Sequence, residues 1–463
     1  MTTNIDDLID DILLCVISFL PPKDAARTSI LCRRWRYLYG RCPSIAFDQR
    51  NFGGDGEFRT KIFLNIISST LLFYKGESLE QFKLVFNANA TYKLSKCPTY
   101  FDSFLRTARE KNVRSICLEM SYASSTVLHD KTNKPNTEDE YCLPSYIFKC
   151  ASLQRLILKD CTLGTIGTPS LQNLAVLHLI RVEGSKQSIQ ELITNCISLR
   201  ELAVEGCPLL AKLQISLLKL ETLSVRCCHQ MKSLRISAPN LFSLNFEADL
   251  FNKLDFNLLK PEELRCVRLC LCQQKEYING IFFELPKPPS SLTRAKEFTK
   301  FAMELQNTKN LSLASSSFED FAIEELLQFA PLQLHNVKHL SLKGWIGSRK
   351  AILGVSILLA LMPSIESLIL EFTENTTEKP QDSTVTDEEP IDFPSIDCLN
   401  YTLKRITLRK FVGDEAELIL LKHILQHAAF LDEVCIGWGK EKHVNLEDIN
   451  ELKNSKSIKI IDE

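Results

Sequence analysis

The sequence predicts an α/β fold, with a small helical module at the N-terminal end followed by a solenoid of mixed strands and helices. Two observations lead to this fold class. A short strand-like apolar unit recurs through the middle of the chain, and helical segments alternate with its later copies. Ahead of the first copy, residues 18–39 form an apolar and basic stretch that is too short to bury its own apolar surface.

The recurring unit reads Leu-x-x-Φ-x-Φ, where Φ is an apolar residue. Six copies begin at steps of 21 to 25 residues: Leu153, Leu174, Leu199, Leu220, Leu241 and Leu264. Alternate side chains of a strand share one face, so the apolar positions are expected to point inward, where stacked units bury them together. This spacing, with cysteine at the ninth position, is the signature of leucine-rich repeats. Four copies carry that cysteine: Cys161, Cys207, Cys228 and Cys272.

Weaker copies of the unit lie about half a repeat away from the main ones, and they predict strands on the return side of those coils: they begin at Leu210, Met231 and Phe251. Further along, the unit recurs at longer steps near residues 308, 337, 365, 403 and 431. Helical segments are expected between these copies. One of them, residues 415–430, places five apolar residues on one face: Leu418, Leu421, Ile424, Leu425 and Ala428.

Composition and charge limit the function classes. With a formal net charge of −2, the chain is not expected to be a general nucleic-acid binder. Residues 1–14 contain four acids and lack the pattern of a signal peptide, so the 17 cysteines are expected to be mostly reduced, in the cytoplasm, the nucleus or both. The longest apolar run, residues 351–362, indicates a buried helix, because a membrane span needs about 20 residues.

No catalytic, metal or cofactor site is predicted. Two cysteine pairs are spaced too closely for ordinary zinc ligands: Cys227/Cys228 and Cys270/Cys272. Two histidine pairs lie four residues apart, and neither has the Glu of a metalloprotease helix after its first histidine: His335/His339 and His423/His427. The second pair is expected on the exposed face of its helix. There is no phosphate loop, dinucleotide-binding turn or nucleophile elbow in the sequence.

Residues 373–394 interrupt the repeats. They contain six acids between Glu374 and Glu389, three prolines and few apolar residues, a composition that cannot offset ordering entropy by burial. We expect an acidic flexible loop between two repeat units. Ser383 and Thr384 in it are candidates for phosphorylation, although loop residues of this kind are more often simply solvated.

The start of the chain holds a helix that is apolar on two sides. One stripe follows helical spacing through six residues: Ile9, Ile12, Leu13, Val16, Ile17 and Leu20. A second apolar surface contains Leu8, Leu14, Cys15 and Phe19. The following helix, near residues 22–35, can cover one side, but about forty residues bury too little surface to cover both. The second side is therefore expected to bind a partner protein.

The stretch from Leu8 to Tyr39, LIDDILLCVISFLPPKDAARTSILCRRWRYLY, resembles the F-box motif of plant F-box proteins nearly position by position. In that family a proline begins the first helix and packs on the adaptor, whereas this chain has Ile9, so the resemblance implies that adaptor affinity could be reduced. Cys32 stands where serine is common. Later segments resemble the repeats of F-box/leucine-rich-repeat proteins and, at residues 403–436, their FBD-type tail.

The resemblance implies four parts. They are an F-box helical module (1–45), a leucine-rich-repeat solenoid (46–372), the acidic flexible loop (373–394) and an FBD-type C-terminal repeat region (395–463). It also implies a function. The F-box would bind the adaptor of an SCF-type cullin–RING ubiquitin ligase, and through it the cullin. The repeats would hold a protein substrate near the conjugating enzyme. The chain would then promote ubiquitin transfer by proximity and would not carry out the chemical step itself.

On this interpretation ten residues form the adaptor-binding surface: Leu8, Ile9, Ile12, Leu13, Val16, Phe19, Leu20, Pro21, Leu31 and Trp35. Several of them could equally belong to the core of the module, because periodicity defines faces and not partners. Three basic residues could form salt bridges to an acidic adaptor: Arg33, Arg34 and Arg36. A nuclear-localisation signal is the alternative for the RRWR stretch, which is short and mixed with apolar residues.

The substrate is expected on the outward face of the repeat strands. Seven residues are candidates for that contact: Arg155, Ile157, Lys159, His178, Glu201, Glu205 and Arg226. Neighbouring coils differ in charge, which suits a peptide or protein surface better than a small anion. For each residue alone, simple solvation is the competing interpretation.

Three hypotheses follow from the sequence. The first is a substrate-recognition subunit of a ubiquitin ligase, with no cofactor, no nucleic-acid partner and no membrane partner. The second is a non-catalytic leucine-rich-repeat scaffold with a degenerate F-box, and Ile9 is the feature that motivates it. The third is a receptor that also needs a small-molecule co-ligand, which would require a deep polar pocket.

Overall fold

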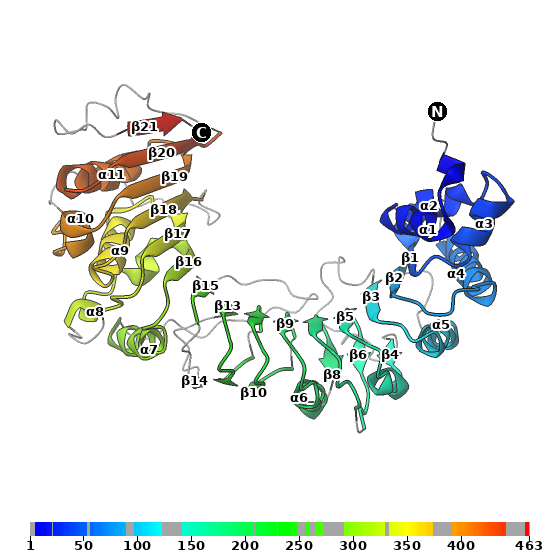
Figure 1. Ribbon diagram of the computed structural model, residues 1–463. Helices are drawn as coiled ribbons and strands as arrows, with labels where there is room; N and C mark the ends of the chain where they lie inside the picture. Colours follow the sequence, from blue (N-terminus) through cyan, green and yellow to red (C-terminus); the bar gives the residue numbers. More distant parts are fainter. Residues whose placement is uncertain are drawn as a thin grey trace. The chain divides into compact units, whose positions relative to one another are not determined.

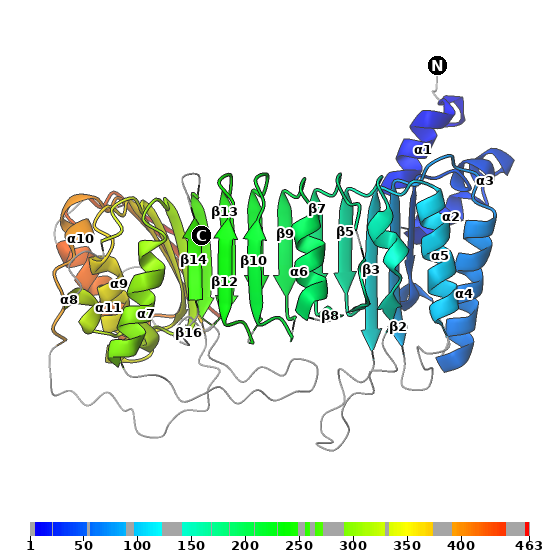
Figure 2. The same cartoon turned by 90° about the horizontal axis from the view of Figure 1, so that it is seen from below.

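The computed structural model describes residues 5–20, 22–52, 56–88, 97–122, 141–167, 169–184, 186–207, 209–228, 230–248, 255–259, 264–271, 291–328, 333–373, 391–440 and 459–462. Within these residues the chain divides into two compact units, one ending at Leu220 and the other beginning at Glu221. Each unit is described by itself. In both, helices lie on one face of a sheet of parallel strands (Figures 1 and 2).

The first unit begins with the helical module. It consists of η1 (Ile5–Asp7), α1 (Asp10–Phe19), α2 (Pro22–Thr28) and α3 (Arg33–Tyr39). Asp10 and Asp11 lie in the first turn of α1, where negative charge is favourable to the helix dipole. The three helices enclose a small core of six buried residues: Leu13, Ile17, Ala25, Trp35, Leu38 and Cys42.

Six strands of the first unit form one parallel sheet. Their order is β1 (Ser44–Asp48), β2 (Gln81–Ala88), β3 (Ser115–Tyr122), β5 (Arg155–Lys159), β7 (Val176–Ile180) and β9 (Glu201–Glu205). Three short strands form a second parallel sheet: β4 (Cys142–Leu143), β6 (Thr162–Leu163) and β8 (Glu183–Gly184). The remaining elements are η2 (Gln49–Asn51), α4 (Gly56–Leu72), α5 (Pro98–Glu110), η6 (Ser145–Lys149), α6 (Lys186–Asn195) and β10 (Lys212–Ser216).

Burial alternates along the strands as the repeat pattern predicts. In β5, Leu156 and Leu158 are buried, whereas Ile157 and Lys159 between and after them are partly exposed. Because β5 pairs with β7 without a shift, Leu158 lies opposite the equally buried Leu179. The leucines of successive units therefore stack into one continuous core, which confirms the predicted solenoid.

The cysteine at the ninth position of the repeat is buried and bonded to its own coil. The Cys161 thiol donates to the carbonyl of Lys159 at 3.3 Å, and the Cys228 thiol donates to the carbonyl of Arg226 at 3.3 Å. Cys207 lies within 3.6 Å of the carbonyl of Glu205. Cysteine suits this position because its side chain is small and largely apolar. Its thiol is a weak donor that fits beside a carbonyl at the end of the strand. Cys272 lies outside the described residues.

The residue after each of several strands adopts the left-handed backbone conformation that turns the chain. It is Asp160 after β5 (φ 56°), Arg181 after β7 (φ 47°) and Gly206 after β9 (φ 61°). The Arg181 guanidinium donates two hydrogen bonds of 2.6 Å to the two carboxylate oxygens of Asp160. These two hydrogen bonds link neighbouring turns. They stabilise the left-handed backbone conformation, which non-glycine residues adopt only at a cost of about 1 kcal/mol.

In the part of the second unit that the structure describes, nine strands form one parallel sheet. Their order is β11 (Thr222–Arg226), β13 (Ser243–Ala248), β15 (Cys266–Leu271), β16 (Asn310–Ser317), β17 (His339–Trp345), β18 (Ser367–Phe372), β19 (Arg405–Phe411), β20 (Glu433–Trp438) and β21 (Lys459–Asp462). On the return side β12 (Ser233–Ser237) pairs with β14 (Asp255–Leu259). With β10, these strands match the three weaker copies of the unit.

Helices join the later strands of the second unit. They are α7 (Ser291–Met303), η7 (Phe318–Phe321), α8 (Glu325–Gln328), α9 (Arg349–Ala360), α10 (Asp397–Tyr401) and α11 (Glu415–His427). The apolar run 351–362 falls largely on α9 and is buried, as predicted. Gly354 lets α9 approach η7 closely, because a Cβ atom at this position would lie 2.0 Å from the carbonyl oxygen of Phe318.

The C-terminal helix α11 corrects two expectations. Its buried residues include Leu420 as well as Leu421, Ile424 and Leu425, whereas Leu418 is only half-buried. His423 was expected on the exposed face, but it is half-buried because the ring of Phe393 stacks on it, with centroids 3.7 Å apart. Burial, with a smaller contribution from His427, lowers the pKa of His423 to about 4.

Several other expectations can be compared with the described part of the chain. No two of its cysteines form a disulfide bond. It holds no cluster of three or more His, Cys, Asp or Glu side chains suited to a metal ion, and none of its helices is both long and apolar enough to cross a bilayer. Most of the predicted acidic loop, together with Ser383 and Thr384, lies outside the described residues. The four-part domain division stays a prediction.

Candidate adaptor-binding face and solenoid surface

An apolar face of the helical module lies open to solvent. Its members are the exposed apolar residues from η1 through α1 and of the turn before α3: Ile5, Leu8, Ile9, Ile12, Val16, Phe19, Ile30 and Leu31. We call these eight residues the apolar face. Phe19 is the most open of them, with 82% of its surface exposed. A patch of this kind on a module whose core is already complete marks an interaction site.

The structure corrects the predicted adaptor surface at two positions. Leu13 is 0% exposed and Trp35 is 4% exposed, and both belong to the core of the module. Their packing holds together the helices that carry the apolar face, but their own side chains are not exposed on it. Leu20 is half-buried against the same core. Pro21 lies outside the described residues.

The fold divides the apolar stripe that helical spacing predicts along α1 into a buried part and an exposed part. Leu13 and Ile17 turn inward, whereas Ile9, Ile12 and Val16 of the same stripe turn outward. Sequence reasoning missed Ile5 and Ile30, which are also exposed. Ile30 lies in the turn between α2 and α3, so helical periodicity could not indicate its exposure.

Arg34 ties α3 to the start of α1. Its Nε and one terminal nitrogen donate to the Asp10 carboxylate at 2.9 and 2.8 Å, and the same terminal nitrogen reaches the carbonyl of Leu8 at 2.5 Å. Arg34 was one of three candidates for a salt bridge to the adaptor, and in the structure it joins two helices of the module. Arg33 and Arg36 are exposed.

Ile9 occupies the N-cap of α1 and is 63% exposed. Its backbone is extended, with φ −69° and ψ 154°, and its carbonyl accepts the first hydrogen bonds of the helix, from Ile12 and Leu13. Proline fixes φ near this same value. The replacement of proline by isoleucine therefore leaves the start of the helix in a proline-compatible geometry and adds an exposed apolar side chain.

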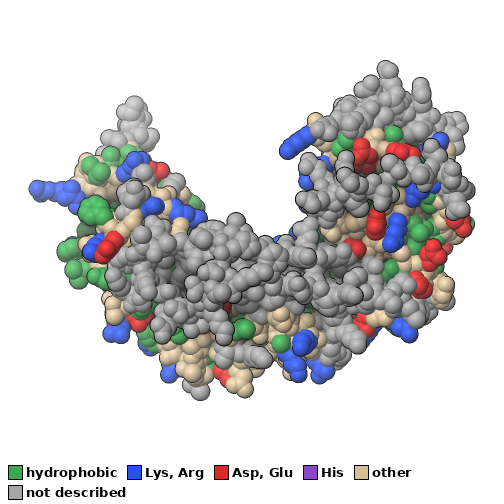
Figure 3. Space-filling view, turned by 180° about the vertical axis from the view of Figure 1, so that it is seen from behind, with side chains coloured by type: hydrophobic (Ala, Val, Ile, Leu, Met, Phe, Trp, Pro, Cys, Tyr) green, Lys and Arg blue, Asp and Glu red, His purple; other side chains and the backbone are tan. Residues whose placement is uncertain are grey.

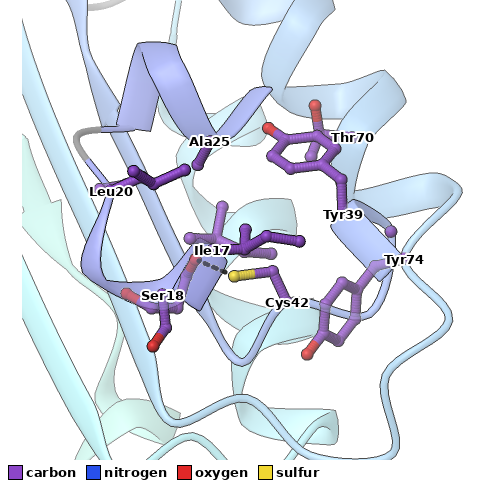
Figure 4. A pocket seen from close by; sticks show the side chains of 12 residues that line it. Ile17, Ser18, Leu20, Ala25, Tyr39, Cys42, Thr70 and Tyr74 are labelled. Atoms are coloured by element: carbon purple, nitrogen blue, oxygen red, sulfur yellow. Dashed lines mark hydrogen bonds between the residues drawn. The ribbon is translucent and has the colours of Figure 1, made fainter. Parts of the chain in front are cut away.

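A small pocket lies where the module meets the first repeat (Figure 4). Ile17 lines it from α1, Leu20 from the C-cap of that helix, Tyr39 from the end of α3, and Tyr74 from the segment after α4. The Cys42 thiol donates to the carbonyl of Ser44 at 3.3 Å along its wall. Burial raises the pKa of Tyr74 to about 12 and also raises the pKa of Tyr39 and Cys42. The titratable groups that line the pocket are therefore neutral, as expected where two parts of the first unit pack together.

A second exposed apolar stripe runs along α4. Phe58, Ile62 and Ile66 follow each other at four-residue steps, and Leu72 and Phe73 extend the exposed apolar surface at the end of the helix. Figure 3 shows hydrophobic side chains gathered at the helical end of the first unit. This helix is not among the functional elements that the sequence predicts.

The outward face of the first unit carries six of the seven predicted substrate contacts. Each lies at a strand position that is exposed or partly exposed: Arg155, Ile157, Lys159, His178, Glu201 and Glu205. His178 pairs with Glu201 at 2.6 Å, and Lys159 pairs with Glu119 of β3. These charges are largely matched within the face, with the half-buried Ile157 among them. Arg226 lies in the second unit, where its Nε donates to Glu247 at 2.9 Å.

These features define a class of protein: a helical docking module joined to a parallel leucine-rich-repeat solenoid. An F-box family model matches residues 5–38, and a repeat family model described as "At1g61320/AtMIF1, LRR domain" matches residues 74–459. The chain belongs to this leucine-rich-repeat family and carries an F-box domain. The predicted fold class and the resemblance to F-box/leucine-rich-repeat proteins are thereby confirmed, whereas the FBD-type tail stays a prediction.

Proteins of Arabidopsis thaliana are similar to this chain. The putative F-box/FBD/LRR-repeat protein At4g00315 is 30% identical over 50% of this chain and 51% of its own length. The F-box/FBD/LRR-repeat protein At5g56420 is 30% identical over 44% of each. The alignments thus span about half the length of these two relatives. The F-box/FBD/LRR-repeat protein At3g52680 is 25% identical over 98% of this chain and 89% of its own length.

Proposed function

We propose that the chain is the substrate-recognition subunit of an SCF-type cullin–RING ubiquitin ligase. The apolar face binds the adaptor, which connects the chain to the cullin, and the solenoid binds a target protein. The chain makes no covalent bond itself. It holds the target near the charged conjugating enzyme, which makes ubiquitin transfer effectively intramolecular. The cytoplasm or the nucleus is the compartment in which this function operates, and the residues after 394 act as an FBD-type repeat region.

The observation that carries the proposal is the contrast between the core and the surface of the module. Leu13, Ile17 and Trp35 already form a closed core, so the exposed apolar side chains are not needed to fold it. Exposed apolar area is unfavourable in water at about 25 cal/mol per Å², and the apolar face is retained on η1, on α1 and on the turn before α3. A partner that covers it explains both its extent and its position at the end of the solenoid.

A leucine-rich scaffold with a degenerate F-box is the second candidate, and Ile9 is the residue that favours it. The proline-compatible backbone of Ile9 weighs against a disrupted helix start. The two candidates differ in one measurable property, which is affinity for the adaptor.

The decisive experiment is a calorimetric titration of the full chain with a plant-type SCF adaptor. The test variant is Ile12→Asp/Phe19→Asp, because both residues are exposed on the apolar face. The matched control is Ile197→Asp/Leu209→Asp, which makes the same chemical change at two exposed apolar positions of the solenoid. Circular dichroism establishes that both variants are folded. A Leu13→Asp change is unsuitable, because it would place a charge in the core.

Saturable binding by the wild type and the control, with loss of binding in the test variant, supports the ligase function. If the wild type does not bind but an Ile9→Pro variant does, the scaffold candidate is correct. If no folded variant binds, the apolar face has another partner and the proposal is wrong.

A further inference from the structure

Three adjacent strands of the second unit carry an excess of positive charge. The segments from residue 338 through β17, from 366 through β18 and from 404 through β19 contain six cations and two carboxylates, which leaves a net charge of +4. The cations are Lys338, Lys343, Lys404, Arg405, Arg409 and Lys410. The whole chain has a formal net charge of −2, so this excess is local. Composition alone does not reveal it, because the three segments are separated along the chain.

Both carboxylates are already bound between lysines. Glu366 lies 2.9 Å from the ammonium group of Lys338 and 3.2 Å from that of Lys404. In the same way Glu371 lies 3.1 Å from Lys343 and 2.9 Å from Lys410. Hydrogen bonds from the lysines lower the pKa of each carboxyl group, so both remain ionised at neutral pH. Within the described residues, Arg405 and Arg409 form no ion pair with either glutamate.

A bulge at the end of β19 exposes an additional cation. Lys410 has a φ of 55°, and the pairing with β20 shifts between Arg409 and Phe411. As a result, the consecutive residues Arg409 and Lys410 are both exposed, where a regular strand would bury one of them. A non-glycine residue in this conformation is strained, and the strain here places a second cation beside Glu371.

The register shows how the outward side chains are arranged. Lys343, Glu371 and Arg409 lie in one row across the strands, because the pairing of β17 with β18 and of β18 with β19 has no shift there. The next row contains Ser341, Ile369 and Thr407, and the third contains His339, Ser367 and Arg405. Cations therefore occupy three corners of a rectangle, Lys343, Arg405 and Arg409, and His339 occupies the fourth. Small hydroxyl side chains and the half-buried Ile369 lie between the corners.

We propose that this outward face of β17, β18 and β19 binds an acidic, Asp/Glu-rich segment of the target protein. The inference rests on the proposed function, because it assigns a substrate class to the solenoid of a ligase receptor. The charges are complementary, and the rectangle measures about 10 Å by 13 Å by ordinary strand geometry, which suits a few extended residues. The guanidinium groups of Arg405 and Arg409 bind carboxylates through paired hydrogen bonds, and Ser341 and Thr407 provide hydroxyl donors between them.

One carboxylate works against this binding. Glu433 of β20 lies opposite Arg405 in the register and faces the same side of the sheet. Its removal should therefore strengthen the binding of an acidic segment. This gives the proposal a test in which affinity rises, and a rise cannot result from misfolding.

The experiment measures fluorescence anisotropy of a labelled Asp/Glu-rich peptide titrated with the full chain at low and moderate salt. The loss variant is Arg405→Glu/Arg409→Glu, and the gain variant is Glu433→Gln. A control with the same change in net charge is Lys350→Glu/Lys422→Glu, at exposed positions on α9 and α11. We expect about tenfold weaker binding or more for the loss variant, tighter binding for the gain variant and little change in the control. A peptide with Asn and Gln in place of the acids should not bind.

Adaptor titration of the same variants separates this inference from the proposed function. If the loss variant binds the adaptor normally but binds the acidic peptide as well as the wild type does, the inference is overturned and the ligase function stands. The same holds if the acidic peptide binds no variant, or if the control loses as much affinity as the loss variant. If a phosphoserine peptide binds and the carboxylate peptide does not, the assigned substrate class is wrong.

Discussion

Replacement of Phe19 by alanine should weaken adaptor binding without weakening the fold. Phe19 is 82% exposed at the end of α1. Complete burial of a phenylalanine side chain contributes about 1.5–3 kcal/mol, so a partner that covers the exposed part gains about 1.2–2.5 kcal/mol. Loss of that contribution corresponds to a Kd that rises about 8- to 70-fold. Since no core contact is removed, the free energy of unfolding should change by less than about 0.5 kcal/mol.

Leu13→Ala is the matched comparison, because Leu13 lies on the same helix but is fully buried. It should destabilise the module by about 2–5 kcal/mol through lost burial and the cavity left behind. Calorimetric titration with the adaptor measures the first effect, and urea unfolding of the same samples measures the second. A Phe19→Ala variant that unfolds early, or binds within about twofold of the wild type, would refute this division between surface and core.

Three further predictions concern single positions. Ile9→Pro should be tolerated and stabilise α1 by about 0.4–1 kcal/mol, because φ is already −69°; an earlier unfolding midpoint would contradict this. Gly354→Ala should destabilise the second unit by about 1–3 kcal/mol, since its Cβ would lie 2.0 Å from the Phe318 carbonyl oxygen. Helix propensity alone predicts a gain of about 1 kcal/mol, so thermal unfolding decides between them. Burial holds the pKa of His423 near 4, below its ordinary 6.5. The folded state therefore resists protonation, stability should fall as pH drops from 6.5 towards 4, and His423→Phe should flatten that slope in urea titrations at successive pH values.

The repeat architecture could be predicted from the sequence because the pattern that forms it is local. Each unit places its apolar residues at fixed offsets from its first leucine, and a strand translates those offsets directly into inward positions. The return strands were predictable for the same reason. β12, for example, lies on the weaker copy that begins at Met231.

The candidate site was less predictable because it depends on which sides of α1 its neighbours cover. The periodicity of α1 is the same for Leu13 and Ile12, yet Leu13 is buried and Ile12 is exposed. Trp35 in α3 and the bond from Arg34 to Asp10 decide this, and both come from residues more than twenty positions away. Helical spacing contains no information about such contacts.

The half-buried His423 illustrates the same limit. Its position on α11 is compatible with solvent by helical spacing, but Phe393 arrives from before α10 and stacks on its ring. The cluster of cations on β17, β18 and β19 is likewise produced by strand register. In each case the decisive neighbour is distant in sequence.

The thiol bonds of Cys161 and Cys228 have a consequence for how such chains change over evolutionary time. Each thiol donates to a carbonyl two residues earlier in its own coil. Because each thiol has an acceptor in its own coil, duplication or deletion of that coil leaves the buried donor with a partner. Recombination between units can therefore lengthen or shorten the repeat sheet while the N-terminal helical module remains unaltered.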